Sequence, residues 1–462
     1  MDNIDSAYLW AMLSLPALAI VLTYLLRSRY NELIALHLAV FWTQFFAYGW
    51  VWLLGQPSFR FPGWIMLLLG FELTVYSGAF VVLAGPMRRF VNTVSGAALE
   101  VLPRMLLLWI TLSMGAYLYI ISTYGVLVLI PTADVAESAG MPSYLTYLNG
   151  LLAVPAWGGV FCCCIRLAYR RFHPIQLVAL AYVLMHMLVE GNGGKRQILL
   201  VVAVVALFGL RRPLRITWRA VAGVMATACV LFVMWGLYEG VRNNLRDILF
   251  VGQRYDSGVD LIEALVTPPK ERRDIVGAVV EKNLQTRTAP IWLLEQLAEQ
   301  PNLAGGAFIS QSFQNVIPSA FGKTQTLHEN DILSDKLDFP SDDQPWTMLN
   351  EMQAETSAFA ALLTPLLYVG LFWLYWSVIA RWRGRSDMLM LVAIGIVVFE
   401  AGEVQTTLTA TLVYLRTLSI YLAFGSVLWH LRQNVRPIAS SPRVDRLPLN
   451  NAESARSEYR TA

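Results

Sequence analysis

The sequence predicts an all-α polytopic membrane protein with about 11 transmembrane helices and one large external loop that contains short helices. Hydrophobic residues make up 56% of the 462 residues and charged residues only 15%, whereas a soluble domain carries roughly 25% charge. The apolar residues come in runs of about 20, long enough to cross a hydrocarbon core of about 30 Å as helices. These runs do not alternate polar and apolar residues, which excludes the strands of a membrane barrel.

The apolar runs define the expected order of the chain. We expect spans at about 7–26, 33–54, 63–84, 105–130, 145–165, 175–190, 197–210, 217–238, 358–380, 388–403 and 411–431. Residues 1–238 then hold helices one to eight, 239–356 form a periplasmic loop, 357–432 hold helices nine to eleven, and 433–462 form a disordered cytoplasmic tail. The seventh and tenth spans are short, so we expect tilt, burial among other helices or extension into a neighbouring loop. Two acids and no base precede the first run, so it should remain as an anchor.

Basic residues test the number of spans, because short cytoplasmic loops collect Lys and Arg. Alternate short loops, beginning with the first, hold fifteen basic residues: Arg27, Arg29, Arg88, Arg89, Arg104, Arg166, Arg170, Arg171, Arg211, Arg212, Arg215, Arg219, Arg381, Arg383 and Arg385. The intervening short loops hold three, namely Arg60, Lys195 and Arg196. This alternation predicts that the N-terminus lies outside the cytoplasm and the C-terminus inside.

The connection 239–356 then lies outside the cytoplasm, and its length of 118 residues is unusual. Loops longer than about 12–15 residues without a role are uncommon. This one holds 10 Lys and Arg against 18 Asp and Glu, and eight of the acids fall between Glu329 and Glu355. We therefore expect the active site in this loop and at the ends of the spans beside it.

A glycine-rich turn, Gly191 to Arg196, lies just before the seventh span. Its glycines allow the backbone to approach a ligand closely, and their amides can donate to an anion. Lys195 and Arg196 add positive charge at the membrane surface, which suits the phosphate of a lipid-linked substrate. A glycine turn whose two cations touch lipid headgroups is an equal alternative.

The external loop contains a second basic element. Arg287 precedes an amphipathic stretch, which is followed by Gly305-Gly306, by a second short helix that ends at Pro318, and by Lys323. A cation at the edge of such a re-entrant element can bind a headgroup phosphate. The alternative is a surface arginine paired with Glu295 or Glu299.

These motifs resemble a known family. An arginine-containing glycine loop that enters a membrane segment, followed by an external loop with Arg287, Gly305-Gly306, Ile317-Pro318 and Lys323, resembles the Wzy-like O-antigen and exopolysaccharide repeat-unit polymerases. Asn350, Glu351 and Glu355 before the next apolar segment are similar too. Where the family often begins the following helix with glycine, this chain has Thr356-Ser357-Ala358. The resemblance covers about 190–380 closely and the rest only by hydropathy.

The resemblance implies a metal-independent, GT-C-like membrane glycosyltransferase of the bacterial inner membrane. Such enzymes move a glycan from undecaprenyl diphosphate onto another lipid-linked repeat unit at the periplasmic face, beside a flippase and a chain-length regulator. Arginines can stabilise the diphosphate leaving group through charge-assisted, bidentate hydrogen bonds. We therefore expect Arg196, Arg287, Lys195, Arg416 and Lys323 to bind the diphosphate.

No cofactor is expected, and neither is a nucleic-acid partner. Cys162, Cys163, Cys164 and Cys229 all lie in apolar runs and lack the Cys/His spacing of a zinc site. No aspartate pair or His/Asp cluster stands at metal-ligand spacing in an external position. Arginines in place of a metal are consistent with this pattern.

Ionisable residues inside spans are costly and so mark interactions. Glu72 and His37 are expected to form hydrogen bonds between helices, and His186 and Glu190 share one face of the sixth span.

Glu400 and Glu403 lie at the outer end of the tenth span, and Arg416 enters the membrane from the same side. A structural Glu–Arg416 pair is the favoured interpretation, and diphosphate binding by Arg416 is the alternative.

The general base is expected among three external residues, because the attacking hydroxyl must lose its proton. Glu355 lies just before the ninth span and ranks first, His328 is the sole histidine of the external loop and ranks second, and Glu351 lies one turn before Glu355. A solvated acidic loop is the alternative for all three.

Two other functions compete with the polymerase. An O-antigen ligase uses the same donor with a different acceptor, and the motifs do not separate it from a polymerase. A lipid-linked oligosaccharide flippase belongs to another class. The chain has no internal repeat, and its polar residues lie on one side, whereas transporters often have inverted repeats around a midplane site.

Overall fold

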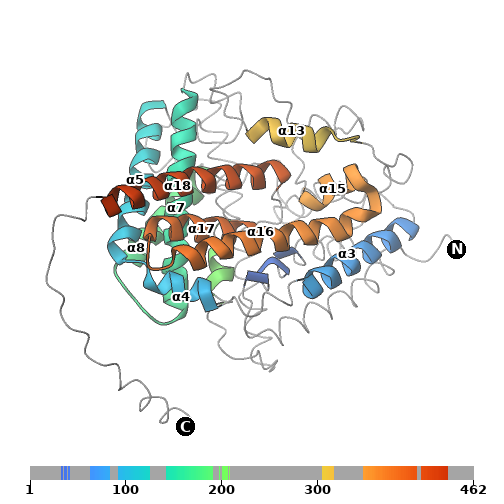
Figure 1. Ribbon diagram of the computed structural model, residues 1–462, viewed down its shortest axis with the longest axis horizontal. Coiled ribbons are helices and arrows are strands. Elements are labelled where there is room, and N and C mark those ends of the chain that lie inside the picture. Colours follow the sequence, from blue (N-terminus) through green and yellow to red (C-terminus); the bar gives the residue numbers. More distant parts are fainter. Residues whose placement is uncertain are drawn as a thin grey trace, which may run out of the picture.

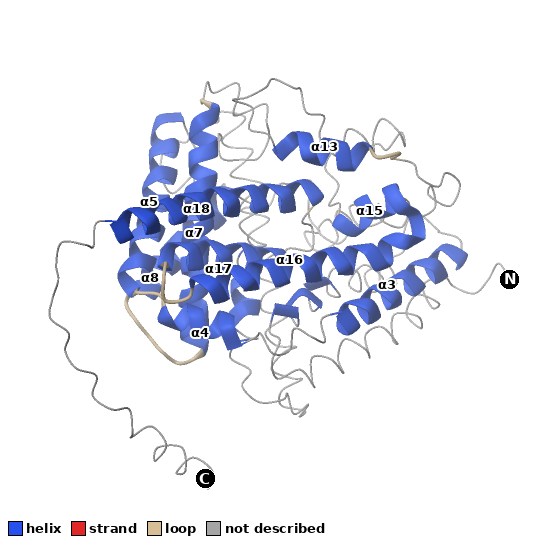
Figure 2. Ribbon diagram, viewed as in Figure 1, coloured by secondary structure: helices blue, strands red, loops and turns tan. Residues whose placement is uncertain are grey.

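The computed structural model describes residues 63–83, 92–124, 142–190, 304–316, 347–402 and 407–434, and scattered residues between 33 and 41 and between 197 and 208. The helices are α3 (Gly63–Leu83), α4 (Asn92–Glu100), α5 (Pro103–Tyr124), α7 (Ser143–Ala168), α8 (Ile175–Glu190), α13 (Ala307–Val316), α15 (Met348–Thr356), the 3-10 turn η4 (Ser357–Phe359), α16 (Ala360–Trp382), α17 (Asp387–Gly402) and α18 (Leu408–Asn434) (Figure 1). No strand occurs among these residues (Figure 2). The predicted all-α class is confirmed for this part of the chain.

Four of the described helices are long and apolar enough to cross a membrane, and two shorter ones are apolar as well. The four are Pro103–Tyr124, Tyr147–Ala168, Ala360–Trp382 and Leu408–Leu428, and the shorter two are Gly70–Leu83 and Ile175–His186. The four correspond to the spans predicted at about 105–130, 145–165, 358–380 and 411–431. The chain is therefore an α-helical membrane protein. The total of eleven spans stays a prediction, because those at 7–26 and 217–238 lie outside the described residues.

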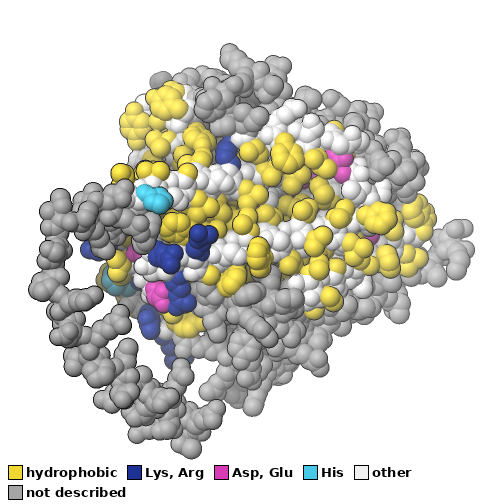
Figure 3. All heavy atoms as spheres, viewed as in Figure 1, with side chains coloured by type: hydrophobic (Ala, Val, Ile, Leu, Met, Phe, Trp, Pro, Cys, Tyr) yellow, Lys and Arg dark blue, Asp and Glu magenta, His cyan; other side chains and the backbone are white. Residues whose placement is uncertain are grey.

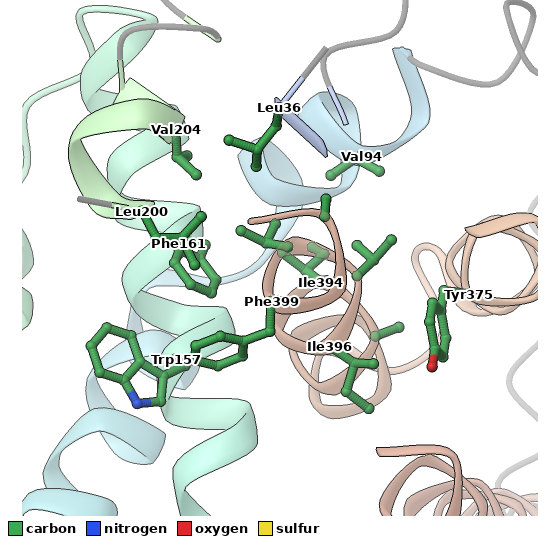
Figure 4. Packing of buried hydrophobic residues seen from close by; sticks show 14 of the residues in the cluster. Leu36, Val94, Trp157, Phe161, Leu200, Val204, Tyr375, Ile394, Ile396 and Phe399 are labelled. Carbon is green, nitrogen blue, oxygen red and sulfur yellow. The ribbon is translucent and has the colours of Figure 1, made fainter. Parts of the chain in front are cut away.

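The short tenth span is the central helix of the described bundle. All residues of α17 from Leu389 to Ala401 are buried. α7 and α16 pack against it, and Figure 4 shows Phe399 of α17 beside Trp157 and Phe161 of α7. Of the possibilities for this span, burial among other helices is the one that the structure confirms.

Two glycines allow α7 and α17 to pack closely. A Cβ atom on Gly158 would lie 1.9 Å from the Leu391 carbonyl oxygen, and one on Gly395 would lie 2.6 Å from that of Val154. No side chain fits at such distances, so the two backbones are in direct contact. Small residues at crossings of this kind are typical of membrane helices.

The C-terminal end of α4 collects polar contacts from three other helices, and we call this group the α4 end. Arg166 of α7 donates to the carbonyl oxygens of Ala98, at 3.2 Å, and of Leu99 and Val101. The carbonyls of Ala98 and Leu99 belong to the last turn of α4, and that of Val101 follows it, so that all three would otherwise lack helical partners. A guanidinium therefore completes the C-terminus of α4. Residues 92–100 were expected within a loop, and the structure corrects this to a helix.

Two further contacts complete the α4 end. Arg383, just after α16, forms an ion pair with Glu100 in which Nε and Oε2 are 2.7 Å apart. The backbone N–H of Leu102 donates to Asp387, the first residue of α17, over 3.1 Å. On the face shown in Figure 3, basic side chains gather where α16 ends and hydrophobic side chains cover the helices. The side of the membrane on which this end lies stays a prediction.

Candidate functional site

Three of the predicted site residues lie in the described part of the chain, namely Glu351, Glu355 and Arg416. They lie on α15 and α18, and each of them contacts either α13 or α18. We call this group of three helices the α13–α15–α18 cluster. Lys195, Arg196, Arg287, Lys323 and His328 lie outside the described residues.

The helix α15 begins with a capping box. The Thr347 side chain accepts from the Asn350 backbone N–H, and the Asn350 side chain accepts from the Thr347 N–H over 3.2 Å. Such reciprocal bonds satisfy two donors that a helix start otherwise leaves free. Every residue from Met348 to Glu355 is buried, although half of them are polar. Polar residues at these positions need partners, and neighbouring helices supply them.

The carboxylate of Glu355 lies at the N-terminus of α13. It accepts from the backbone N–H groups of Gly306, Phe308 and Ile309, over 2.6, 2.8 and 3.3 Å. Gly305 and Gly306 have positive φ angles of 55° and 86°, which glycine adopts without a steric penalty. A negative charge at a helix N-terminus is favoured by the helix dipole. Both oxygens of Glu355 are thus engaged in fixing the start of α13.

The carboxylate of Glu351 likewise lies at the N-terminus of a helix, in this case α18. Its Oε2 accepts from the backbone N–H of Leu408 over 2.7 Å, and the Thr407 hydroxyl accepts from Ala410 N–H over 3.2 Å. Glu351 and Glu355 are one helical turn apart, as predicted. The structure adds that each holds the N-terminus of a different helix.

Arg416 lies at the other end of α13. Its Nη1 donates to the Val316 carbonyl oxygen over 2.6 Å, and its guanidinium carbon is 5.3 Å from the centroid of the Tyr147 ring. No carboxylate among the described residues contacts it, and its buried Nε has no hydrogen-bond partner. Glu400 accepts from Thr411 instead. Of the two possible partners in the favoured Glu–Arg416 pair, Glu400 therefore does not contact Arg416, and Glu403 lies outside the described residues, so a pair with Glu403 stays a prediction.

The helix α13 runs beside the first turns of α18. Ser312 accepts a hydrogen bond from Thr409 over 3.0 Å, and Val316, four residues later, meets Arg416. Phe308, Gln311 and Ser312 form its buried face. The predicted short helix between Gly306 and Pro318 is confirmed.

The intramembrane polar residues behave largely as expected. Glu72 of α3 accepts a hydrogen bond from Gln353 of α15, and His37 Nε2 is 2.7 Å from the Tyr76 hydroxyl. Both residues therefore link parts of the chain far apart in sequence. His186 lies among aromatic rings, with the Tyr117 and Tyr182 centroids each 4.4 Å away.

Polar residues of the cluster that were not predicted as site residues include Gln353, Gln311 and Asn350, the last of which was named only for the family resemblance. The Thr347-x-x-Asn350 spacing resembles a capping-box pattern and could have indicated the start of α15. Gln353 and Gln311 have no local pattern, because what distinguishes them is burial against other helices. Chemically, the cluster presents two hydrogen-bonded carboxylates, one cation that no carboxylate contacts within the described residues, and a buried amide.

Comparisons of the chain with protein-family models, with curated proteins and with solved structures gave no match.

Proposed function

We propose that the protein polymerises undecaprenyl-diphosphate-linked oligosaccharide repeat units into O-antigen or exopolysaccharide at the periplasmic face of a bacterial inner membrane. A chain-length regulator and a flippase are the proposed protein partners. The proposal is supported by the resemblance of the sequence around α13 and by the contacts that hold this helix at both ends. It concerns a region in which a membrane helix bundle meets a long polar loop.

The observation that carries the proposal is the guanidinium of Arg416. A charged group within a membrane helix is costly unless a partner compensates for it. Among the described residues, Arg416 has a carbonyl and an aromatic ring as partners, but no carboxylate. A diphosphate would supply a negative charge for this group, and the planar guanidinium can bind it with two parallel hydrogen bonds.

The reaction then needs little beyond the positioning of charges. The bond between the anomeric carbon and the diphosphate oxygen breaks, and a hydroxyl of the second repeat unit bonds to that carbon. The hydroxyl proton passes to a base, and the electron pair of the broken bond stays on the diphosphate. Arg416, together with Arg196 and Arg287, is proposed to stabilise that developing charge.

The geometry bears on the choice of base. Glu355 accepts three backbone N–H bonds at the start of α13, and Oε2 of Glu351 accepts one at the start of α18, so protonation of either carboxylate would remove the charge that these N–H groups stabilise. We propose that these two glutamates position the helices. Of the three candidates, this leaves His328 as the base to test first.

The test uses purified protein in nanodiscs with lipid-linked repeat units, and long products are resolved on a gel. Arg416→Ala should lower the rate by about 100-fold or more, since removal of one donor to a developing charge costs about 2.7–4 kcal/mol. Arg416→Lys should recover only part of this, because Lys lacks the planar bidentate geometry.

Arg383→Ala is the matched control, because it removes an arginine whose charge is already paired with Glu100. It should leave the rate unchanged. Full activity in Arg416→Ala would contradict the assigned role, and dependence on a divalent metal would remove the argument for arginines. Transfer to a lipid A-core acceptor without chain growth would identify a ligase. Lipid translocation without any transfer would identify a flippase.

A further inference from the structure

The amide of Gln311 is the least satisfied polar group of the α13–α15–α18 cluster. The residue is 6% exposed, and among the described residues neither its Nε2 nor its Oε1 has a hydrogen-bond partner. Its neighbours on α13 do form hydrogen bonds: the Ser312 hydroxyl accepts from Thr409, and the backbone N–H groups of Phe308 and Ile309 donate to Glu355. Gln311 shares the buried face of α13 with these bonded groups.

An amide buried without partners is unfavourable. About 90% or more of buried polar groups in proteins have a hydrogen bond, and a lost partner costs about 1–3 kcal/mol. A methionine of similar length would fill the same space without that cost. A ligand that supplies both partners explains why an amide stands at this position.

The chemistry of the amide selects the kind of ligand. Nε2 donates and Oε1 accepts, so the best partner carries a donor and an acceptor side by side. Two adjacent sugar hydroxyls meet this condition, since one can accept from Nε2 while the other donates to Oε1. A phosphate offers acceptors alone and would leave Oε1 unsatisfied. Arg416, which only donates, has the opposite preference.

The spacing along α13 fits a sugar next to a phosphate. Gln311 precedes Val316 by five residues, which is about 7–8 Å along a helix. The Val316 carbonyl accepts from Arg416, the proposed diphosphate ligand. Along the axis of α13, Gln311 is thus offset by about the length of one monosaccharide from the carbonyl that Arg416 contacts.

We infer that Gln311 binds an adjacent pair of hydroxyls on the sugar next to the diphosphate, and so helps to select the glycan. This inference rests on the proposed function, because the sugar is that of the proposed donor. Gln311 is then a specificity-determining residue.

The experiment compares Gln311→Met with Gln314→Met in nanodiscs. Gln314 lies on the exposed face of the same helix and is the matched control. The probe is the oligosaccharide repeat unit of the strain's own surface polysaccharide, released from its lipid by mild acid. Two quantities are measured: the unfolding temperature without the probe, and the Kd of the probe.

Gln311→Met should unfold at the same or a higher temperature without the probe, and should bind the probe at least 10-fold more weakly. Gln314→Met should match the wild type in both quantities. Gln311→Glu keeps the acceptor but loses the donor, so its Kd should rise as well. An unchanged Kd in Gln311→Met, a lower unfolding temperature in that variant, or no binding of the probe by the wild type would each overturn the inference.

Binding and turnover separate this inference from the proposed function. If the probe binds through Gln311 but the wild type forms no polymer, the polymerase proposal fails and the sugar site stands. If the wild type polymerises, and Gln311→Met polymerises and binds equally well, the sugar site fails alone.

Discussion

The α4 end and the α13–α15–α18 cluster are both polar, but they handle charge differently. At the α4 end, Arg383 faces a carboxylate and Arg166 faces backbone carbonyls. In the cluster, two carboxylates face backbone N–H groups, and Arg416 faces a carbonyl and a ring. The helix α16 joins the two regions, since it begins just after α15 and ends beside Arg383.

This difference distinguishes contacts that stabilise the fold, at the α4 end, from a candidate binding site in the α13–α15–α18 cluster. Every contact at the α4 end links helices, and the buried Arg166 there donates to three carbonyl oxygens. In the cluster, the described part of the chain supplies neither a carboxylate for Arg416 nor a hydrogen-bond partner for the amide of Gln311. Groups left in this state are costly in a protein interior. We therefore expect substitutions at the α4 end to affect stability, and those at Arg416 and Gln311 to affect function.

The strongest test of this comparison asks whether the two regions lie on opposite sides of the membrane. Single cysteines would replace Ser310 on α13 and Arg385 after α16, both exposed, in a variant without other cysteines. A membrane-impermeant thiol reagent added to intact spheroplasts should label the first and not the second. α16 has 23 residues, and a helix spans about 1.5 Å per residue, so it is long enough to separate them.

Labelling of Ser310→Cys only after the membrane is opened would place the cluster in the cytoplasm. That result would contradict the polymerase proposal, because undecaprenyl-linked units are proposed to be joined outside. Opening the membrane should also make Arg385→Cys reactive, which serves as the control for accessibility.

The next largest effect should come from the crossing of α7 and α17, which supports both regions. Gly158→Val would put side-chain atoms onto the Leu391 carbonyl, so the helices must separate. Overpacking costs about 1–3 kcal/mol and occasionally more, and here the obstacle is backbone that cannot rotate away. We expect loss of monodisperse protein in size-exclusion chromatography.

Gly150→Val, on the same helix, is the control, because nothing lies within 4 Å of a Cβ at that position. Normal elution of Gly158→Val would show that the two helices are not in contact through their backbones.

A substitution of Glu355 tests whether this residue holds the start of α13 or acts as the general base. Glu355→Gln keeps an acceptor but removes the charge at the N-terminus of α13, so it should cost about 1–2 kcal/mol. The unfolding temperature should fall, and donor binding should weaken with it. Glu351→Gln should show the same pattern through α18.

The measurements are thermal unfolding, donor binding and turnover of each variant. Lost turnover with unchanged stability and binding would restore Glu355 as the general base.

The parts of the fold that were predicted from the sequence are those marked by local signals, namely glycine, proline and long apolar runs. Gly305-Gly306 and Pro318 bracket α13, and the long apolar runs mark the four membrane-length helices. The sequence did not predict the roles of the two glutamates, because their hydrogen-bond partners are distant along the chain. Glu355 accepts from Gly306, which is 49 residues away, and Glu351 accepts from Leu408, which is 57 residues away. The central place of α17 was also hidden, since a uniformly apolar helix looks the same whether it faces lipid or protein.

The smallest expected effect is at the α4 end, in the ion pair of Glu100 and Arg383. The hydrogen bond from Arg383 holds the pKa of Glu100 below its usual value, and the same pair raises the pKa of Arg383. A carboxylate whose pKa is lower in the folded protein stabilises it above the unfolded pKa, and loses this contribution as the pH falls through the folded pKa. Both side chains are exposed, so the pair should contribute only about 0.2–1 kcal/mol at neutral pH.

Unfolding temperatures of the wild type, Glu100→Gln, Arg383→Gln and the double variant form a cycle that isolates the pair. The coupling should be positive at pH 7, decrease in high salt because the charges are screened, and vanish as the pH is lowered below the usual value for Glu of about 4.5. A coupling that persists unchanged in acid and in salt would mean that the pair is shielded from water. The ion pair would then be as protected from water as the buried Arg166 of the same end, and its contrast with the α13–α15–α18 cluster would lose its basis.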